Sequence, residues 1–365
     1  MTNSSNSPLS TEQSSADETE TTLEAQKEIS HEADTVEPKS DELVEEIALL
    51  EEEPVEEIAL LEDEPVDTMD TQEEKVAGKS EHTGWWLVGS SAIGAMHVQK
   101  NIPCQDSYAI KRLDKDKGVA VVCDGAGSKM HSDLGAQFIS DKASEWLSQV
   151  LANRPEVFDE EASVQQLSNE LYTYLYEQLA NYATEQELAF DTLGCTLIAV
   201  IYQPHTLTCI HIGDGRAAYQ DIDGDWHALM NPWNTEEGYT IFLTTKAVHD
   251  APAPRTEYIR SRIINAAVAS FVIMSDGCEN ASFECLILDK ETKKYIQPNR
   301  PFPQFFNPVK ATLVQVHRHY LSEDEEVTKV WTKFLEEGTP QLKNESDDKT
   351  MVFAINSVFL KSDEN

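Results

Sequence analysis

After residue 84 the spacing of hydrophobic residues changes several times between the pattern typical of strands and the pattern typical of helices. The predicted strands follow one another along the chain, and so do the predicted helices. Runs of apolar residues predict strands at 85–94, 106–113, 118–124, 193–202, 206–214, 215–222, 270–277 and 349–358. Apolar residues at three- and four-residue spacing predict long amphipathic helices at 131–153 and 163–185. A third helix is expected over 307–321 or in the stretch that ends at 338. This grouping favours an α+β fold with helices around antiparallel sheets over the regular alternation of a parallel sheet.

Residues 1–83 lack the apolar pattern of a folded domain. They contain 26 Asp and Glu against four Lys, and no Phe, Trp or Tyr. Low hydrophobicity combined with high net charge leaves too little apolar surface to offset chain entropy. We therefore expect a disordered acidic tail over 1–83 and a folded domain over 84–360.

The tail contains a tandem repeat of eleven residues, VEEIALLEEEP at 44–54 followed by VEEIALLEDEP at 55–65. Each copy could form a short amphipathic helix that offers a partner protein an equivalent docking motif. Isolated helices of this length are marginal in water, so the repeat could also be a duplicated linker that binds nothing. Of these two interpretations, the pattern favours the linker.

Charge and composition exclude several classes of function. The formal net charge is −38, whereas nucleic-acid affinity comes largely from Lys and Arg on phosphates, so we expect no nucleic-acid partner. The chain has no apolar run of about 18 residues and does not begin with a signal-peptide pattern. We therefore expect no membrane association and a cytoplasmic protein. We also expect the protein to be a monomer. The cysteines lack the C-x-x-C spacing that is typical of zinc sites.

Aspartates stand at the ends of several predicted strands. They are Asp106, Asp124, Asp214, Asp276, Asp347 and Asp348. A single Asp-Gly pair is more typical of a turn, but a cluster of carboxylates near a core requires compensation by cations. Because Lys and Arg are scarce near these positions, and because oxygen-only donor sets select Mg²⁺, Mn²⁺ or Ca²⁺, the pattern predicts a divalent metal site.

The motifs CQDSYA, VVCDGAGS, GCTLIAVI, IGDGRAAY, VIMSDG and DDKTMVF occur in this order. With GSSAIGAMHVQKNIPCQD at the front and PFPQFFNP late in the chain, the set resembles the metal-dependent protein serine/threonine phosphatases of the PPM or 2C type, specifically a compact bacterial branch, over about 86–357. The resemblance implies a four-layer αββα sandwich with two Mg²⁺ or Mn²⁺ ions in a cleft between the sheet edges. It also implies hydrolysis of phosphoserine and phosphothreonine on protein substrates by a water activated between the two ions.

Carried over by motif, the resemblance assigns roles to individual aspartates. Asp124 would bridge both ions, and the backbone carbonyl of Gly125 would bind one of them. Asp276 and Asp347 would bind the other ion, while Asp106 would act directly or through water. Catalysis is expected to depend most strongly on Asp124 and Asp276.

The remaining motif aspartate, Asp214, resembles the residue that helps to hold a third, weaker ion in this family. Three positions depart from the better-known members. Gln105 stands where they carry Glu, Ala126 stands where they carry His, and their phosphate-binding Arg aligns near Asn101. The QD and DGAG forms look typical of the compact bacterial branch, but they leave the general acid and the phosphate anchor unassigned.

Three nearby residues are candidates for these roles. His97 precedes the first metal motif, on the strand expected to lead into the cleft, and could be the general acid or a structural histidine at a strand end. Lys100 and His131 could bind the substrate phosphate, or be a solvated lysine and a helix-start residue. The alternative function is a catalytically weak pseudophosphatase that binds phosphoproteins as a scaffold, with the acidic repeats as its docking arm. Retention of the paired carboxylates favours the enzyme.

Overall fold

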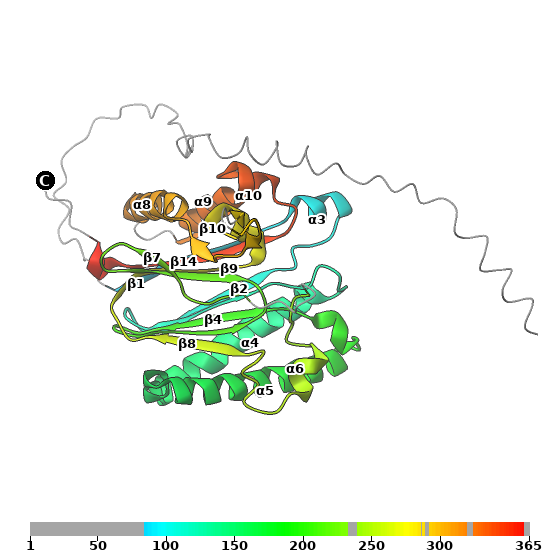
Figure 1. Cartoon of the computed structure of the whole chain (residues 1–365). Coiled ribbons are helices and arrows are strands. Elements are labelled where there is room, and N and C mark those ends of the chain that lie inside the picture. Colours follow the sequence, from blue (N-terminus) through cyan, green and yellow to red (C-terminus); the bar gives the residue numbers. More distant parts are fainter. Residues whose placement is uncertain (1–83, 233–238, 286, 289–291, 320–323, 361–365) are drawn as a thin grey trace, which may run out of the picture. The chain divides into compact units, whose positions relative to one another are not determined.

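Two five-stranded antiparallel sheets stack face to face, and helices cover their outer faces (Figure 1). The computed structural model describes residues 84–232, 239–285, 287–288, 292–319 and 324–360. The first sheet has the order β1 (Trp85–Ala92), β14 (Lys349–Asn356), β9 (Val268–Met274), β6 (Arg216–Asp221), β7 (Trp226–Ala228). The second has the order β2 (Ser107–Arg112), β3 (Gly118–Cys123), β4 (Leu197–Tyr202), β5 (Leu207–Ile212), β8 (Arg260–Ile264). The expected αββα sandwich is confirmed.

The strand pattern explains why both faces of each sheet are buried. In β3, Val119 and Val121 pack against the helices α4 (Ser132–Asn153) and α5 (Glu161–Glu185), while Ala120 and Val122 pack against the other sheet. This division follows from the alternation of side chains along a strand. A strand with two buried faces therefore appears in the sequence as a continuous apolar run.

The first sheet is covered by α8 (Pro303–His319) and α9 (Asp324–Glu337). In β14, Met351 and Phe353 face these helices, while Val352 and Ala354 face the second sheet. Trp331 of α9 is 1% exposed, and its indole Nε1 donates a hydrogen bond of 3.0 Å to the carbonyl of Met351. The indole therefore fixes α9 on the sheet both by apolar burial and by a directed polar contact.

The two long helices predicted at 131–153 and 163–185 are confirmed within two residues at each end. Where one further long helix was expected, the structure has both α8 and α9. The remaining helices are α3 (Ala95–Lys100), α6 (Lys246–Asp250), α7 (Glu279–Ser282) and α10 (Pro340–Asn344). The remaining strands are β10 (Phe283–Glu284), β11 (Ile287–Leu288), β12 (Tyr295–Ile296) and β13 (Arg300–Pro301).

The expectation that His97 lies on a strand is wrong. Strand β1 ends at Ala92, and His97 is the buried residue of the short helix α3. The chain turns here because Gly94 approaches the backbone of Asp347 so closely that a Cβ atom would lie 2.5 Å from its carbonyl oxygen. Asn101 then ends the helix in the left-handed conformation, with φ of 54°.

The acidic tail and its tandem repeat lie outside the described residues. Its predicted disorder, and the domain boundary at 84, therefore stay predictions. Among the described helices, none is both long and apolar enough to cross a bilayer.

Candidate metal centre

The antiparallel registers bring the predicted acidic strand ends to one end of the sandwich. In the second sheet, Ser107 at the start of β2 pairs with Cys123 at the end of β3. In the first sheet, Met351 near the start of β14 pairs with Met274 at the end of β9. Residues that precede β2 or β14 therefore lie beside those that follow β3 or β9. The short connection 213–215 carries the chain from β5 into β6, between the two sheets.

Three of the predicted metal ligands meet here. A carboxylate oxygen from each of Asp124, Asp214 and Asp276 lies within 4.8 Å of the other two. Asp124 follows a strand of the second sheet and Asp276 follows a strand of the first, so the cluster joins both sheets. Asp106 and Asp347 lie close enough to exert electrostatic effects on Asp124 and Asp276, respectively. All five predicted carboxylates thus belong to one site.

Burial and mutual repulsion disfavour the ionised forms of these carboxyl groups. Burial, together with repulsion from Asp106 and Asp276, raises the pKa of Asp124 well above its ordinary value. Burial and nearby carboxylates raise the pKa of Asp106 to about 8 and that of Asp276 to about 7. Burial also raises the pKa of Asp214, although the Thr240 hydroxyl donates a hydrogen bond to its carboxylate. Without a cation, the cluster can exist near neutral pH only by retaining protons.

The donor set fits divalent cations. Oδ2 of Asp106 and Oδ1 of Asp276 are buried and have no hydrogen-bond partner within the described part of the chain. Buried oxygens of this kind are expensive unless they have a partner, and a cation supplies one. Since the assembled donors are all oxygens, they suit Mg²⁺ or Mn²⁺ better than ions that prefer nitrogen or sulfur ligands.

Gly125 adds a backbone oxygen to this set. Thr196 donates its amide to the carbonyl of Asp124, and Ala126 donates its amide to the carbonyl of Gly194. In this antiparallel pattern the carbonyl of Gly125 itself points away from the neighbouring strand. A Cβ atom on Gly125 would lie 2.4 Å from the carbonyl oxygen of Gln105. Only glycine therefore allows the loop to approach the first motif this closely.

The side chain of Gln105, at the position where familiar relatives carry Glu, is 4% exposed. Its amide Nε2 donates a hydrogen bond of 3.0 Å to the carbonyl of Lys129, which fixes the orientation of the amide. Its Oε1 is buried and has no hydrogen-bond partner among the described residues. Gln105 therefore presents a neutral oxygen, where Glu would add a negative charge to a cluster that already repels itself.

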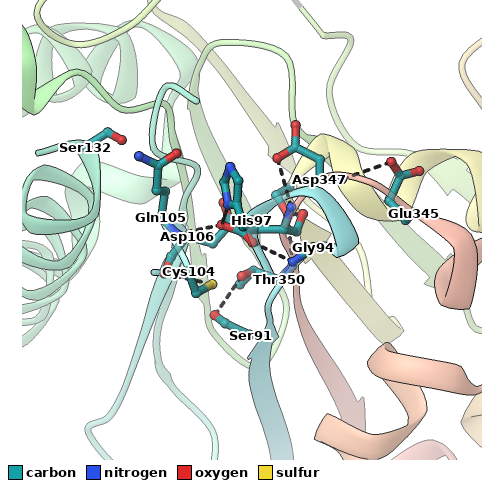
Figure 2. A network of polar contacts seen from close by, with 12 residues as sticks. Ser91, Gly94, His97, Cys104, Gln105, Asp106, Ser132, Glu345, Asp347 and Thr350 are labelled. Atoms are coloured by element: carbon teal, nitrogen blue, oxygen red, sulfur yellow. Dashed lines mark hydrogen bonds and ion pairs between the residues drawn. The ribbon is translucent and has the colours of Figure 1, made fainter. Parts of the chain in front are cut away.

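The sequence analysis counted Asp348 among the strand-end aspartates of the predicted metal site but gave it no role of its own, although it is central to the site's hydrogen bonding. Its carboxylate accepts hydrogen bonds from the amide of Gly94 at 2.7 Å, the amide of Gln105 at 2.6 Å and Nδ1 of His97 at 2.8 Å. Figure 2 shows His97 between the side chains of Gln105 and Asp347, in the same network. The signal for this role in the sequence was the pair of adjacent aspartates before β14. The side chains of neighbouring residues there face different surroundings, so the two aspartates can have different partners.

The remaining predicted residues lie around this network. Lys100 is exposed at the last turn of α3, and His131 is half-buried immediately before α4. Ala126 is 3% exposed and carries no group that could transfer a proton. Asn101 is exposed at the end of α3. Neither Lys100 nor His131 belongs to the carboxylate cluster, so their proposed contacts with phosphate stay predictions.

Two cavities lie elsewhere in the described part of the chain. One of about 320 Å³ is lined by β8 residues including Arg260 and Arg262, and one of about 350 Å³ is lined by residues of β1, β2 and α9. Neither contains any of the clustered carboxylates. The chemistry of the side chains, and not cavity size, therefore identifies the site.

Comparisons with known proteins identify the family to which this chain belongs. The chain matches the family model described as Protein phosphatase 2C over residues 93–324, more than half of its length. It is 25% identical over 276 residues to Serine/threonine-protein phosphatase 3 of Escherichia coli K12, covering 74% of this chain and 98% of that protein.

Solved structures with similar folds include serine/threonine phosphatase Stp1 from Staphylococcus aureus, at 13% identity and a TM-score of 0.45, covering 77% of this chain and 99% of that one. They also include the catalytic domain of the serine/threonine protein phosphatase PstP in complex with two manganese ions, at 15% identity and a TM-score of 0.43, covering 74% and 97%. On the strength of the family model and the ordered motifs, the chain belongs to the protein phosphatase 2C family.

Proposed function

We propose that the chain hydrolyses phosphoserine and phosphothreonine esters on proteins, with Mg²⁺ or Mn²⁺ held at the carboxylate cluster. The observation that carries this proposal is the convergence of Asp124, Asp214 and Asp276 from both sheets to within 4.8 Å. Their raised pKa values support it, because such a cluster is unfavourable without a cation and favourable with one. Family membership supports the choice of phosphoproteins as substrates.

The arrangement suits two ions and a weaker third. Asp124 would bridge the first two. The Gly125 carbonyl would bind one of them, Asp276 and Asp347 would bind the other, and Asp106 would act directly or through water. Asp214 would contribute to the third ion. When bound, these ions would lower the pKa of a water between them and neutralise charge on the phosphoryl group during in-line attack.

The chain's own contribution is to hold these groups in place. The amide of Thr350 donates a 2.9 Å hydrogen bond to the Ser275 hydroxyl, and the Ser275 amide donates a 3.0 Å hydrogen bond to the Thr350 carbonyl. These bonds fix the loop that carries Asp276 against the start of β14, which carries Asp347. The site is therefore organised by the sheet itself, which favours precise positioning.

The test is phosphate release from a phosphothreonine peptide. We expect turnover with Mn²⁺ or Mg²⁺ and none in excess EDTA, and we expect Asp124→Asn and Asp276→Asn each to lose at least about a hundredfold in kcat while remaining folded. Asp223→Asn, which changes an exposed carboxylate in the β6–β7 turn, is the matched control and should retain full activity.

Activity that persists undiminished in EDTA would rule out the metal-dependent mechanism. A wild-type chain that binds the phosphopeptide tightly in Mn²⁺ but releases no phosphate would instead support a phosphoprotein-binding module.

A further inference from the structure

The carboxylate of Asp348 connects three parts of the chain that meet beside the metal centre. It is 2% exposed and receives two backbone amides and the imidazole of His97, which is itself 1% exposed. Two amides and one imidazole N–H satisfy this buried carboxylate within the protein. Asp348 therefore differs from Asp106 and Asp276, each of which has a buried carboxylate oxygen with no hydrogen-bond partner among the described residues.

The contact also determines the orientation of the imidazole. Because Oδ2 of Asp348 accepts from Nδ1 of His97, the hydrogen on Nδ1 is committed to this bond. The other ring nitrogen, Nε2, is then the atom available for chemistry. Figure 2 shows the His97 ring between the labelled side chains of Gln105 and Asp347.

The site otherwise has a gap in its acid chemistry. Ala126, beside the bridging aspartate, cannot donate a proton, and the carboxylates of the cluster are required as ligands. His97 is the imidazole that the network holds beside Gln105 and Asp347, and when protonated it forms a buried ion pair with Asp348. An imidazole held by a carboxylate at one nitrogen is a recurring arrangement for proton transfer at the other.

We propose that Asp348 is a positioning residue that holds His97 so that Nε2 donates a proton to the serine or threonine oxygen as it leaves phosphorus. This inference rests on the proposed phosphatase function. In the step, the oxygen of the attacking water forms a bond to phosphorus, and the ester P–O bond breaks with its electron pair passing to the side-chain oxygen. That oxygen takes the proton from Nε2, which leaves the imidazole neutral. The attacking water releases one proton, and this proton restores the protonated imidazole. The products are the free hydroxyl and inorganic phosphate.

Leaving-group chemistry tests this assignment. Nitrophenolate departs without protonation, whereas the alkoxide of serine or threonine does not. We expect His97→Ala to lower kcat on a phosphothreonine peptide by about 10²- to 10³-fold and to change kcat on p-nitrophenyl phosphate by no more than about threefold. Asp348→Asn should show the same selectivity, with a loss of at least about tenfold on the peptide, because it disturbs the held ring without removing it.

A second histidine–aspartate pair provides the matched control. In the β6–β7 hairpin, Nε2 of His227 lies 2.7 Å from Oδ2 of Asp221, on the surface and outside the metal centre. His227→Ala should leave both substrates unchanged. Mn²⁺ affinity, measured by calorimetry, should stay within about threefold of the wild type in His97→Ala, because the carboxylate cluster is intact.

The outcomes separate the possible roles. Equal loss on both substrates, or a loss of Mn²⁺ affinity that accompanies it, would make the His97–Asp348 pair a structural support and overturn the proposal. An effect confined to KM for the peptide would also overturn it, since that would indicate substrate binding. If the wild type hydrolyses neither substrate with Mn²⁺, the proposed function itself fails, and this result differs from failure of the acid assignment.

Discussion

Replacing Asp276 by Asn should stabilise the metal-free protein, and increasingly so as the pH rises. The folded protein raises the pKa of Asp276 from 3.8 to about 7 through burial and repulsion from Asp214. Between these two values the folded state retains a proton that the unfolded state has released. The free energy of unfolding therefore falls as the pH rises through this window. The amide of Asn cannot ionise, so the variant does not lose this stability.

The size of the effect follows from the two pKa values. At 1.36 kcal/mol per pH unit, the raised pKa of this one carboxyl lowers the free energy of unfolding of the metal-free wild type by about 2 kcal/mol at pH 5 and about 4 kcal/mol at pH 8. For a domain of this size, 1 kcal/mol corresponds to roughly 2 °C in Tm. In EDTA, the Tm of Asp276→Asn should exceed that of the wild type by an amount that grows by roughly 5 °C between pH 5 and pH 8.

The Tm of the variant must be compared with that of the wild type at each pH, because another titratable group makes the folded state more stable as the pH rises. Burial, with repulsion from Arg260 and Arg216, lowers the pKa of His211 to about 3. The unfolded state therefore binds a proton there below about pH 6.5, and the stability contributed by neutral His211 increases as the pH rises from 5 to 6.5. This contribution is common to both proteins and cancels in their difference.

Mn²⁺ should reverse the order of the two proteins. A ligand that binds only the folded state stabilises it in proportion to the logarithm of its concentration above Kd. Asp276→Asn removes one of the carboxylates that we propose to bind Mn²⁺. At pH 8 and saturating Mn²⁺, the wild type should have the higher Tm. Differential scanning calorimetry with Asp223→Asn as the exposed control decides the matter. A Tm difference in EDTA that does not change between pH 5 and pH 8 would refute this account of the cluster.

Three further predictions concern the supports of the site and the tail. Gly277→Ala should lower Tm by at least about 5 °C and abolish the increase in Tm that Mn²⁺ causes, because its Cβ would lie 2.0 Å from the Asp348 carbonyl oxygen. Gly127→Ala is the control in thermal melts, because the nearest neighbour of its Cβ would be 4.0 Å away. Trp331→Phe should cost about 1–3 kcal/mol in urea unfolding, since the Met351 carbonyl loses the indole donor and the core loses part of a buried ring, with no change in kcat. An unchanged midpoint would contradict the assigned hydrogen bond. Deletion of residues 1–80, which contain no aromatic residue, should leave Tm and turnover of p-nitrophenyl phosphate unchanged, and a large fall in Tm would show that this segment contributes to the folded core.

The sequence was most informative where one local pattern determines one element. The periodicity of 131–153 and 163–185 predicted α4 and α5 closely, because each presents an apolar face long enough to define its period. It was less informative around Pro308, which was expected near the start of a helix. That helix begins at Pro303 instead and includes Pro308 in its interior. Packing of its apolar face on the first sheet overrides the local preference against proline.

The clustering of Asp124, Asp214 and Asp276 could be predicted because each of them follows a recognisable strand. The helix α3 could not, because the chain turns at Gly94 for a tertiary reason, the close approach of the Asp347 backbone. The partners of Asp348 were hidden for the same reason. Gly94, His97 and Gln105 are more than 240 residues from it along the chain and meet it only in the folded protein.

The adjacent residues Asp347 and Asp348 illustrate two kinds of aspartate at this site. One kind has its charge compensated by protein hydrogen-bond donors, and the other repels neighbouring carboxylates. Asp348 is buried among three protein donors, so its negative charge is compensated without a metal ion. Asp347 is half-exposed and adds repulsion to Asp276, one oxygen of which has no hydrogen-bond partner in the described structure. Removing Asp348 therefore leaves protein donors without an acceptor, whereas removing Asp276 relieves repulsion until a cation is added. Substitution of Asp348 and substitution of Asp276 should have opposite effects on metal-free stability, although both residues lie at the candidate metal centre and carry the same side chain.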